Sequence, residues 1–182
     1  ELIAGPMYSG KTSKLLDIYK KYDFCGMSTL VINYAEDTRY SPDMLSTHEK
    51  IMIPCVRGSS LKEVADVVGG FPTDEFASAS IILINEGQFF KDIVQWVTVA
   101  VEEHKKTVYV CGLDGDFKRN RFGDWLDLLP MCDKITKLHS FCSMCKRRPA
   151  IFSHRMSEET TQKLIGSDCY VPLCRSCYTN HK

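Results

Sequence analysis

The stretch GPMYSGKT at Gly5–Thr12 fits the pattern G-x-x-x-x-G-K-[ST], and it lies between the apolar run Leu2–Ala4 and a segment of helical periodicity. In this strand–loop–helix context the pattern is typical of a phosphate-binding loop. Gly5 and Gly10 allow backbone dihedrals that a Cβ would forbid, so successive N–H groups can turn toward a di- or triphosphate. A plain turn between strand and helix is the simpler alternative, but the two flanking elements favour a nucleotide site.

The side chains of this loop have expected roles in binding the nucleotide. Lys11 would bring a positive charge to the β- and γ-phosphate oxygens. Thr12 would offer a hydroxyl to Mg²⁺ at the start of a helix whose dipole favours the same anion. The predicted phosphate-binding residues of the loop are Gly5, Pro6, Met7, Tyr8, Ser9, Gly10, Lys11 and Thr12.

Composition excludes several classes of partner. Among 182 residues there are 23 Lys plus Arg and 23 Asp plus Glu, so the formal net charge is zero. No overall positive electrostatic field therefore attracts nucleic acid or an anionic membrane. Apolar runs are of strand length, without a signal peptide or a membrane-spanning segment. Nine cysteines beside a phosphate loop indicate a reducing, cytoplasmic setting, with metal binding favoured over disulfides. The first expected strand begins almost at Glu1, which leaves an N-terminal extension open.

Strands and helices are expected to alternate after the loop. Strands are predicted at residues 29–33, 51–56, 80–84 and 107–111, helices from the loop to about residue 25, at 60–68 and at 93–102, and an irregular loop at 34–50. This alternation predicts an α/β fold with a mainly parallel sheet and helices on both faces. The functional site should then lie at the C-terminal ends of the strands.

A second part of the site is expected where the strand at 80–84 ends. Its apolar run leads directly into Asn85 and Glu86, which places Glu86 at the edge of the sheet that also carries the phosphate loop. A glutamate there can accept a proton from an acceptor hydroxyl or orient a water. A solvated acid in a turn is the simpler alternative, but the position favours a catalytic base.

The last third of the chain carries two C-x-x-C pairs. Together Cys142, Cys145, Cys174 and Cys177 supply four thiolate ligands for tetrahedral zinc, and the metal would close the long segment 146–173. Redox pairs or unligated cysteines are the alternatives, but redox chemistry needs only one pair. These features divide the chain into a nucleotide-binding domain at 1–138 and a small zinc-binding domain at 139–182. The other cysteines have no such spacing and are expected to be apolar fillers or free thiols.

Several motifs, in this order along the chain, resemble those of type II thymidine kinases, the class of the cytosolic cellular enzyme and its poxviral relatives. They are GPMYSGKT, DTRY at 37–40, STH at 46–48, EGQFF at 86–90, LDGDFKR at 113–119 and the cysteine pairs. The resemblance implies transfer of the γ-phosphoryl group of ATP to the 5′-hydroxyl of thymidine or deoxyuridine, for pyrimidine salvage in DNA synthesis. It also implies Mg²⁺ with ATP, structural zinc, a homotetramer and feedback inhibition by dTTP. The segment between the cysteine pairs, the lasso, would close over the nucleoside.

The resemblance further implies roles for individual residues, with lasso positions set to within one residue because the spacing near the lid departs from that of the relatives. Glu86 would be the catalytic base. The phosphate-binding set would include Asp37, Thr38, Arg39, Asn85, Glu86, Gly87 and Gln88. The nucleoside-binding set would be Met7, Phe89, Leu113, Phe117, Ser153, Gln162, Lys163, Leu164, Ile165, Gly166 and Tyr170, with Phe117 packing on the thymine ring. Without the resemblance, the apolar members would be interpreted as ordinary core.

One residue departs from the family pattern. Asn85 stands where the family has Asp, which is expected to hold water on Mg²⁺, and the loss of charge should weaken metal-assisted neutralisation of the transferred phosphate. Three explanations of Asn85 are open: natural drift that Asp37 or Asp114 compensates, an engineered substitution that traps a complex, or an inactive copy of the enzyme. Because Lys11 and Glu86 are retained, an active enzyme with weakened metal use is favoured.

Two other functions stay open at this stage. A P-loop ATPase, or a kinase for another small hydroxyl acceptor, would share the loop, Mg²⁺ and Glu86. A zinc-ribbon module that binds nucleic acid could use the basic run 146–148, although zero net charge and the lack of interleaved aromatic residues argue against it.

Overall fold

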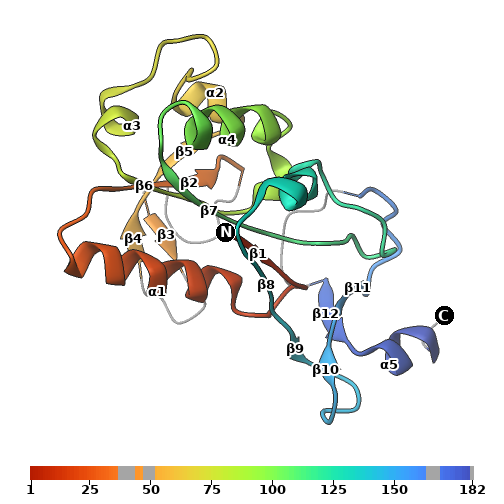
Figure 1. Cartoon of the computed structure of the whole chain (residues 1–182). Coiled ribbons are helices and arrows are strands. Elements are labelled where there is room, and N and C mark those ends of the chain that lie inside the picture. Colours follow the sequence, from red (N-terminus) through yellow and green to blue (C-terminus); the bar gives the residue numbers. More distant parts are fainter. Residues whose placement is uncertain (37–43, 47–51, 163–168, 181–182) are drawn as a thin grey trace.

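The structure, a computed structural model, describes residues 1–36, 44–46, 52–162 and 169–180. Its centre is a six-stranded sheet in the order β5-β2-β6-β7-β1-β8 (Figure 1). These strands are β1 (Leu2–Ala4), β2 (Thr29–Tyr34), β5 (Val56–Gly58), β6 (Ile81–Ile84), β7 (Thr107–Gly112) and β8 (Ile135–Lys137). Every pairing in the sheet is parallel, as the alternation of strands and helices predicted.

Helices cover both faces of the sheet, which confirms the predicted fold class (Figure 1). One face carries α1 (Lys11–Phe24) and the hairpin of β3 (Met44–Ser46) and β4 (Met52–Pro54). The other carries α2 (Leu61–Val64), α3 (Asp74–Ser78), α4 (Ile93–Glu102) and the 3-10 helix η2 (Trp125–Met131). The central strand β6 is apolar along its whole length, as expected for a strand that is buried on both faces. Among the described residues, no helix is long and apolar enough to cross a membrane.

Three predicted elements were wrong in detail. Within the predicted loop at 34–50, β3 forms a strand because its Leu45 is buried against the α1 face. The predicted strand at 51–56 is two strands: β4 pairs antiparallel with β3, and β5 joins the central sheet. Pro54 ends β4 because it has no N–H for a ladder. The helix predicted at 60–68 has the capping box of Ser60 and Glu63 but ends at Val64, since the next residue is extended.

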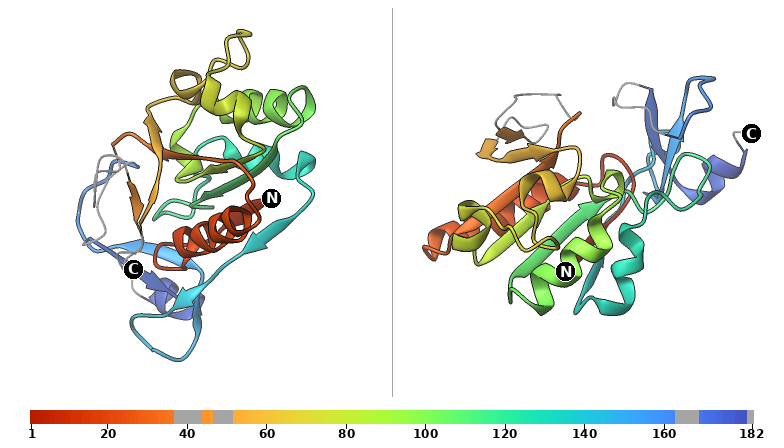
Figure 2. Two further views of the ribbon diagram at one scale, coloured as in Figure 1. Left: turned by 90° about the vertical axis from the view of Figure 1, so that its left-hand side faces the viewer. Right: turned by 90° about the horizontal axis from the view of Figure 1, so that it is seen from above.

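The C-terminal part of the chain leaves the sheet at the C-terminal end of β8. It contains β9 (Ser140–Phe141), β10 (Pro149–Ala150), β11 (Phe152–Arg155), β12 (Tyr170–Leu173) and α5 (Arg175–Asn180), arranged as two small antiparallel sheets and one short helix. A core of its own contains two of the paired cysteines together with Ala150, Leu173 and Tyr178. We call the described residues from 139 to 180 the cysteine module, which lies to one side of the central sheet in Figure 2. A domain boundary near residue 139 stays a prediction.

Candidate active site

The phosphate loop connects β1 to α1 and has an unusual backbone. Gly10, at the N-cap of α1, has φ 81°, and Tyr8 has φ 61° although it is not glycine. A Cβ on Gly5 would lie 2.7 Å from the Leu138 carbonyl oxygen and 2.7 Å from Ser9 Oγ, so only glycine fits there. The Lys11 ammonium donates a hydrogen bond of 2.7 Å to the Pro6 carbonyl oxygen, which holds the cation over the loop.

The loop contains a polar atom suited to an anion. Ser9 Oγ is buried and has no hydrogen-bond partner among the described residues, and its hydroxyl could donate a hydrogen bond to a phosphate oxygen. The Met7 N–H, in contrast, donates to Ser153 Oγ at 2.9 Å and so connects the loop to β11. Met7 and Ser153, both predicted to bind the nucleoside, are therefore in direct contact.

Glu86 lies at the end of β6 in a left-handed backbone conformation, with φ 57°. Such a conformation in a non-glycine residue stores strain and is concentrated at functional sites. Gln88 Nε2 donates to Glu86 Oε2 at 2.6 Å and fixes the direction of the carboxylate. Burial, with a smaller contribution from the charge of Glu86, raises the pKa of the Cys111 thiol to about 12, while the charge of Lys11 opposes the rise. The predicted base and the loop lysine thus both lie near Cys111 on β7.

Asn85 is part of a buried chain of polar groups that crosses three neighbouring strands. Cys111 Sγ donates to Asn85 Oδ1 at 2.9 Å, and Asn85 Nδ2 donates to Asn33 Oδ1 at 2.9 Å. Asn85 and Asn33 are each 2% exposed. Sequence reasoning missed Asn33 and Cys111, because each lies inside an apolar strand with no motif around it. A role of Asn85 toward Mg²⁺ stays a prediction.

The segment after β7 is tied to the residues that follow Glu86. Gln88 Oε1 accepts from the Leu113 N–H at 3.0 Å, and Trp125 Nε1 donates to the Leu113 carbonyl oxygen at 3.0 Å. The Phe89 ring packs against Tyr34 at 4.9 Å and edge-to-face against Phe122 at 5.5 Å. This aromatic group gives the site an apolar wall. Phe122, which is 8% exposed, was missed because a lone aromatic residue in a polar loop carries no signal of its own.

Arg155 gathers several predicted nucleoside-binding residues around it. Its guanidinium lies 3.8 Å from the centroid of the Phe117 ring and donates to the Tyr170 hydroxyl at 3.0 Å. It also donates to the carbonyl oxygen of Gln162 at 3.2 Å, and Gln162 Nε2 donates to Asp116 Oδ2 at 2.9 Å. The predicted residues Lys163, Leu164, Ile165 and Gly166, and likewise Asp37, Thr38 and Arg39, lie outside the described residues.

The four paired cysteines form a cluster with the geometry of a metal site. The Sγ atoms of Cys142, Cys145, Cys174 and Cys177 all lie within 4.8 Å of one another, and those of Cys145 and Cys174 are 3.9 Å apart. Tetrahedral zinc with Zn–S bonds of about 2.3 Å needs sulfur atoms about 3.8 Å apart. Burial opposes ionisation of Cys142, but N–H groups of Cys174 and Cys145 outweigh it and lower the pKa of this thiol to about 6. The cluster therefore fits structural zinc.

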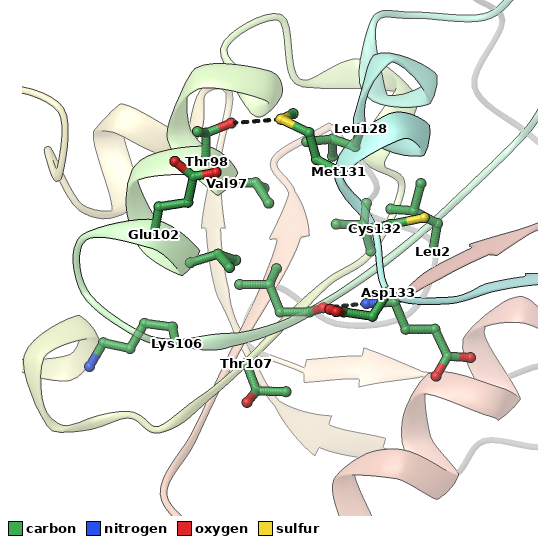
Figure 3. Close-up of a pocket in the computed structure, with 14 residues that line it drawn as sticks. Leu2, Val97, Thr98, Glu102, Lys106, Thr107, Leu128, Met131, Cys132 and Asp133 are labelled. Atoms are coloured by element: carbon green, nitrogen blue, oxygen red, sulfur yellow. Dashed lines mark hydrogen bonds between the residues drawn. The ribbon is translucent and has the colours of Figure 1, made fainter.

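A separate pocket lies at the opposite end of the sheet, where β1 and β7 begin (Figure 3). It lies between α4 and η2, and its lining includes Val97, Thr98, Leu128 and Met131. Thr98 Oγ1 donates a hydrogen bond to Met131 Sδ at 3.8 Å. The phosphate loop and Glu86 follow the other ends of the strands, so this pocket does not belong to the candidate active site.

Comparison with known proteins identifies the family. The sequence matches the protein-family model described as "Thymidine kinase" over residues 1–178. The chain belongs to the thymidine kinase family. It is 38% identical over 97% of its length to the thymidine kinase of Oryza sativa subsp. japonica. It is 36% identical to the cytosolic thymidine kinase of Cricetulus griseus, over 98% of this chain, and 36% identical to the thymidine kinase of Vaccinia virus (strain Ankara), also over 98%.

This thymidine kinase family member covers different shares of those relatives. It spans 65% of the Oryza protein, 72% of the Cricetulus protein and 95% of the Vaccinia protein. Its similarity to both cellular and poxviral members confirms the resemblance inferred from the motifs. Membership of the family also weighs against the two alternatives, an unrelated ATPase and a zinc-ribbon module that binds nucleic acid.

Proposed function

We propose that this chain transfers the γ-phosphoryl group of ATP to the 5′-hydroxyl of thymidine, giving thymidine monophosphate, with deoxyuridine as a further acceptor. The observation that carries the proposal is that Glu86 and Lys11 follow the C-terminal ends of β6 and β1, the two strands on either side of β7, next to the aromatic wall around Phe89. Glu86 can accept a proton and Lys11 can bind phosphate, beside an apolar wall. Family membership supports this assignment.

Glu86 would act as the base toward the acceptor hydroxyl. Its carboxylate is oriented by Gln88, so it can accept the 5′-hydroxyl proton as the phosphoryl group leaves ATP. Lys11 and Arg39 would stabilise negative charge on the transferred group. Thr12 would hold Mg²⁺, which neutralises phosphate charge when bound. The loop N–H groups, Ser9 Oγ, Asp37, Thr38 and the residues 85–88 would complete the phosphate site.

Thymine would lie between the aromatic wall and the cysteine module. Phe117 would stack on the base, while Met7, Phe89 and Leu113 would surround its methyl group. Backbone groups of residues 162–166 would bind the polar edge of the pyrimidine, with Ser153 and Tyr170 near the nucleoside. A base that is enclosed in this way excludes water from the reacting phosphate.

Zinc held by the four cysteines would be structural. It would connect the two C-x-x-C turns, and its binding energy would stabilise a module whose own apolar core is small. By resemblance to the family we further propose that the chain acts in the cytoplasm in pyrimidine salvage, assembles as a homotetramer and is inhibited by dTTP.

The test is Mg²⁺-dependent release of ADP from ATP with thymidine, deoxyuridine, deoxycytidine, deoxyguanosine or no acceptor, with each product confirmed by mass. Release that requires thymidine, with one thymidine monophosphate formed per ADP, supports the proposal. Equal release without any acceptor would assign an ATPase instead. Release that depends on another nucleoside but not on thymidine would assign a different kinase.

A further inference from the structure

Phe117 is held from the cysteine module at its main chain as well as at its ring. The Tyr178 hydroxyl donates to the Phe117 carbonyl oxygen at 2.6 Å, across 61 positions of sequence. We propose that Tyr178 is a positioning residue for Phe117, and that it makes the acceptor site depend on the cysteine cluster. This inference rests on the proposed function, because Phe117 is the residue proposed to stack on thymine.

The cysteine cluster determines where the Tyr178 hydroxyl lies. Tyr178 is one residue beyond Cys177, and its N–H donates to the Cys174 carbonyl oxygen at 2.9 Å. Its ring is 8% exposed and packs on Phe152 at 5.0 Å and on His154 at 5.6 Å. Because Cys174 directly precedes this short helix and Cys177 lies within it, fixing the cluster also fixes the phenol.

The loop that receives the hydrogen bond is a preformed turn. Asp116 Oδ1 accepts from the N–H groups of Lys118 at 2.9 Å and Asn120 at 2.8 Å, and Asp116 is 7% exposed. Arg119 has φ 68°, and its guanidinium lies 4.9 Å from the centroid of the Tyr178 ring. In a turn closed in this way, a bond to the Phe117 carbonyl oxygen fixes the main chain from which the Phe117 ring projects.

Arg155 supplies the complementary contact at the ring itself. Its guanidinium covers the Phe117 ring at 3.8 Å, and Arg155 is 5% exposed. β11 carries Arg155, and α5 carries Tyr178, so both contacts come from the cysteine module. With its carbonyl oxygen and one side of its ring held, Phe117 has a fixed position for stacking on the base.

The decisive variant is Tyr178→Phe, which removes the hydroxyl and keeps the ring. We expect the KM for thymidine to rise about fivefold, the usual effect of losing one hydrogen bond. The KM for ATP, kcat and the zinc content should stay within about twofold of the parent chain. The matched control is Tyr22→Phe, which removes a phenol–phenol hydrogen bond of 2.7 Å on the α1 face. It should leave the KM for thymidine unchanged, and an equal rise in both variants would overturn the proposal.

A double-mutant cycle separates positioning from general damage to the fold. In a Phe117→Ala background the ring is gone, so Tyr178→Phe should have no further effect on the KM for thymidine. Additive effects would overturn the proposal.

Hydrogen exchange without nucleoside gives a readout that does not depend on activity. The N–H groups of Lys118 and Asn120 should exchange faster in Tyr178→Phe than in the parent chain, because their turn is no longer held. Unchanged exchange would refute the positioning role even if the chain phosphorylates thymidine. Faster exchange in a chain that does not use thymidine would uphold the Tyr178–Phe117 link and overturn only the proposed function.

Discussion

The phosphate loop and the proposed thymidine site, the acceptor pocket, are built in different ways. The loop is one continuous octapeptide, and its lysine is held by a residue only five positions away. The pocket is assembled from distant parts of the chain: 61 positions separate Phe117 from Tyr178, and 46 separate Asp116 from Gln162. The loop therefore depends on local backbone geometry, whereas the pocket depends on the docking of the cysteine module. A perturbation of the module should affect thymidine before it affects ATP.

The largest expected effect lies between the two regions, at Glu86. We expect Glu86→Gln to lower kcat by about 10²–10⁴-fold, because a neutral amide cannot accept the hydroxyl proton. Gln at this position keeps an oxygen that can accept from Gln88, so the dissociation constant of thymidine, measured by calorimetry, should stay within about twofold. Intact turnover would remove Glu86 from the role of base, and a large loss of binding would assign it to the pocket instead.

Removing one of the proposed zinc ligands tests whether only the acceptor pocket depends on the cysteine module. In Cys145→Ser we expect most of the zinc to be lost, as measured by elemental analysis, and the KM for thymidine to rise at least about tenfold. Affinity for a non-hydrolysable ATP analogue should change much less, since the phosphate loop is formed between β1 and α1.

The matched control for that variant is Cys132→Ser. Cys132 lies outside the cluster and donates to the Leu129 carbonyl oxygen, a bond that a serine can also make. The Cys132→Ser variant should keep its zinc, and its KM for thymidine should be unchanged. If Cys145→Ser weakened both substrates equally, the contrast between the two regions would be wrong.

The same contrast explains what could be predicted from the sequence. The parallel sheet followed from apolar runs that alternate with helical periodicity, and the cysteine cluster followed from the C-x-x-C spacing. The parts of both signals are local, because each apolar run, each helical segment and each C-x-x-C pair lies within a short window of sequence. The hairpin of β3 and β4 was missed because strands of three residues have too little periodicity to detect.

Residues that act through distant contacts could not be predicted in this way. Arg155 belongs to no motif, and its importance comes from donating to Tyr170 and covering Phe117 once the module has folded. Asn33 lies in an apolar strand, and its role comes from the hydrogen bond that it accepts from Asn85, the residue after the neighbouring strand β6. Such roles are set by tertiary packing, which a sequence pattern does not contain.

Asn85→Asp tests whether the side chain at this position serves mainly the buried chain of polar groups or the binding of Mg²⁺. The added charge should raise turnover at limiting Mg²⁺. It should also lower the free energy of unfolding by about 1–3 kcal/mol, because a buried carboxylate would face the oxygen of Asn33. Denaturant unfolding and a Mg²⁺ titration of activity measure the two effects. The exposed Asn180→Asp is the control for added charge alone, and an unchanged Mg²⁺ dependence in Asn85→Asp would refute the metal role.

The smallest expected effect is at Ser153, where the two regions meet. Its hydroxyl accepts from the Met7 N–H of the phosphate loop, while β12 pairs with its strand inside the cysteine module. Ser153→Ala should therefore raise the KM for ATP and the KM for thymidine together, each about three- to fivefold, because one lost hydrogen bond loosens both sides. Ser153→Thr keeps the hydroxyl and should restore both values. A change in the KM for thymidine alone would mean that Ser153 belongs to the pocket, and the two regions would then be more independent than this hydrogen bond implies.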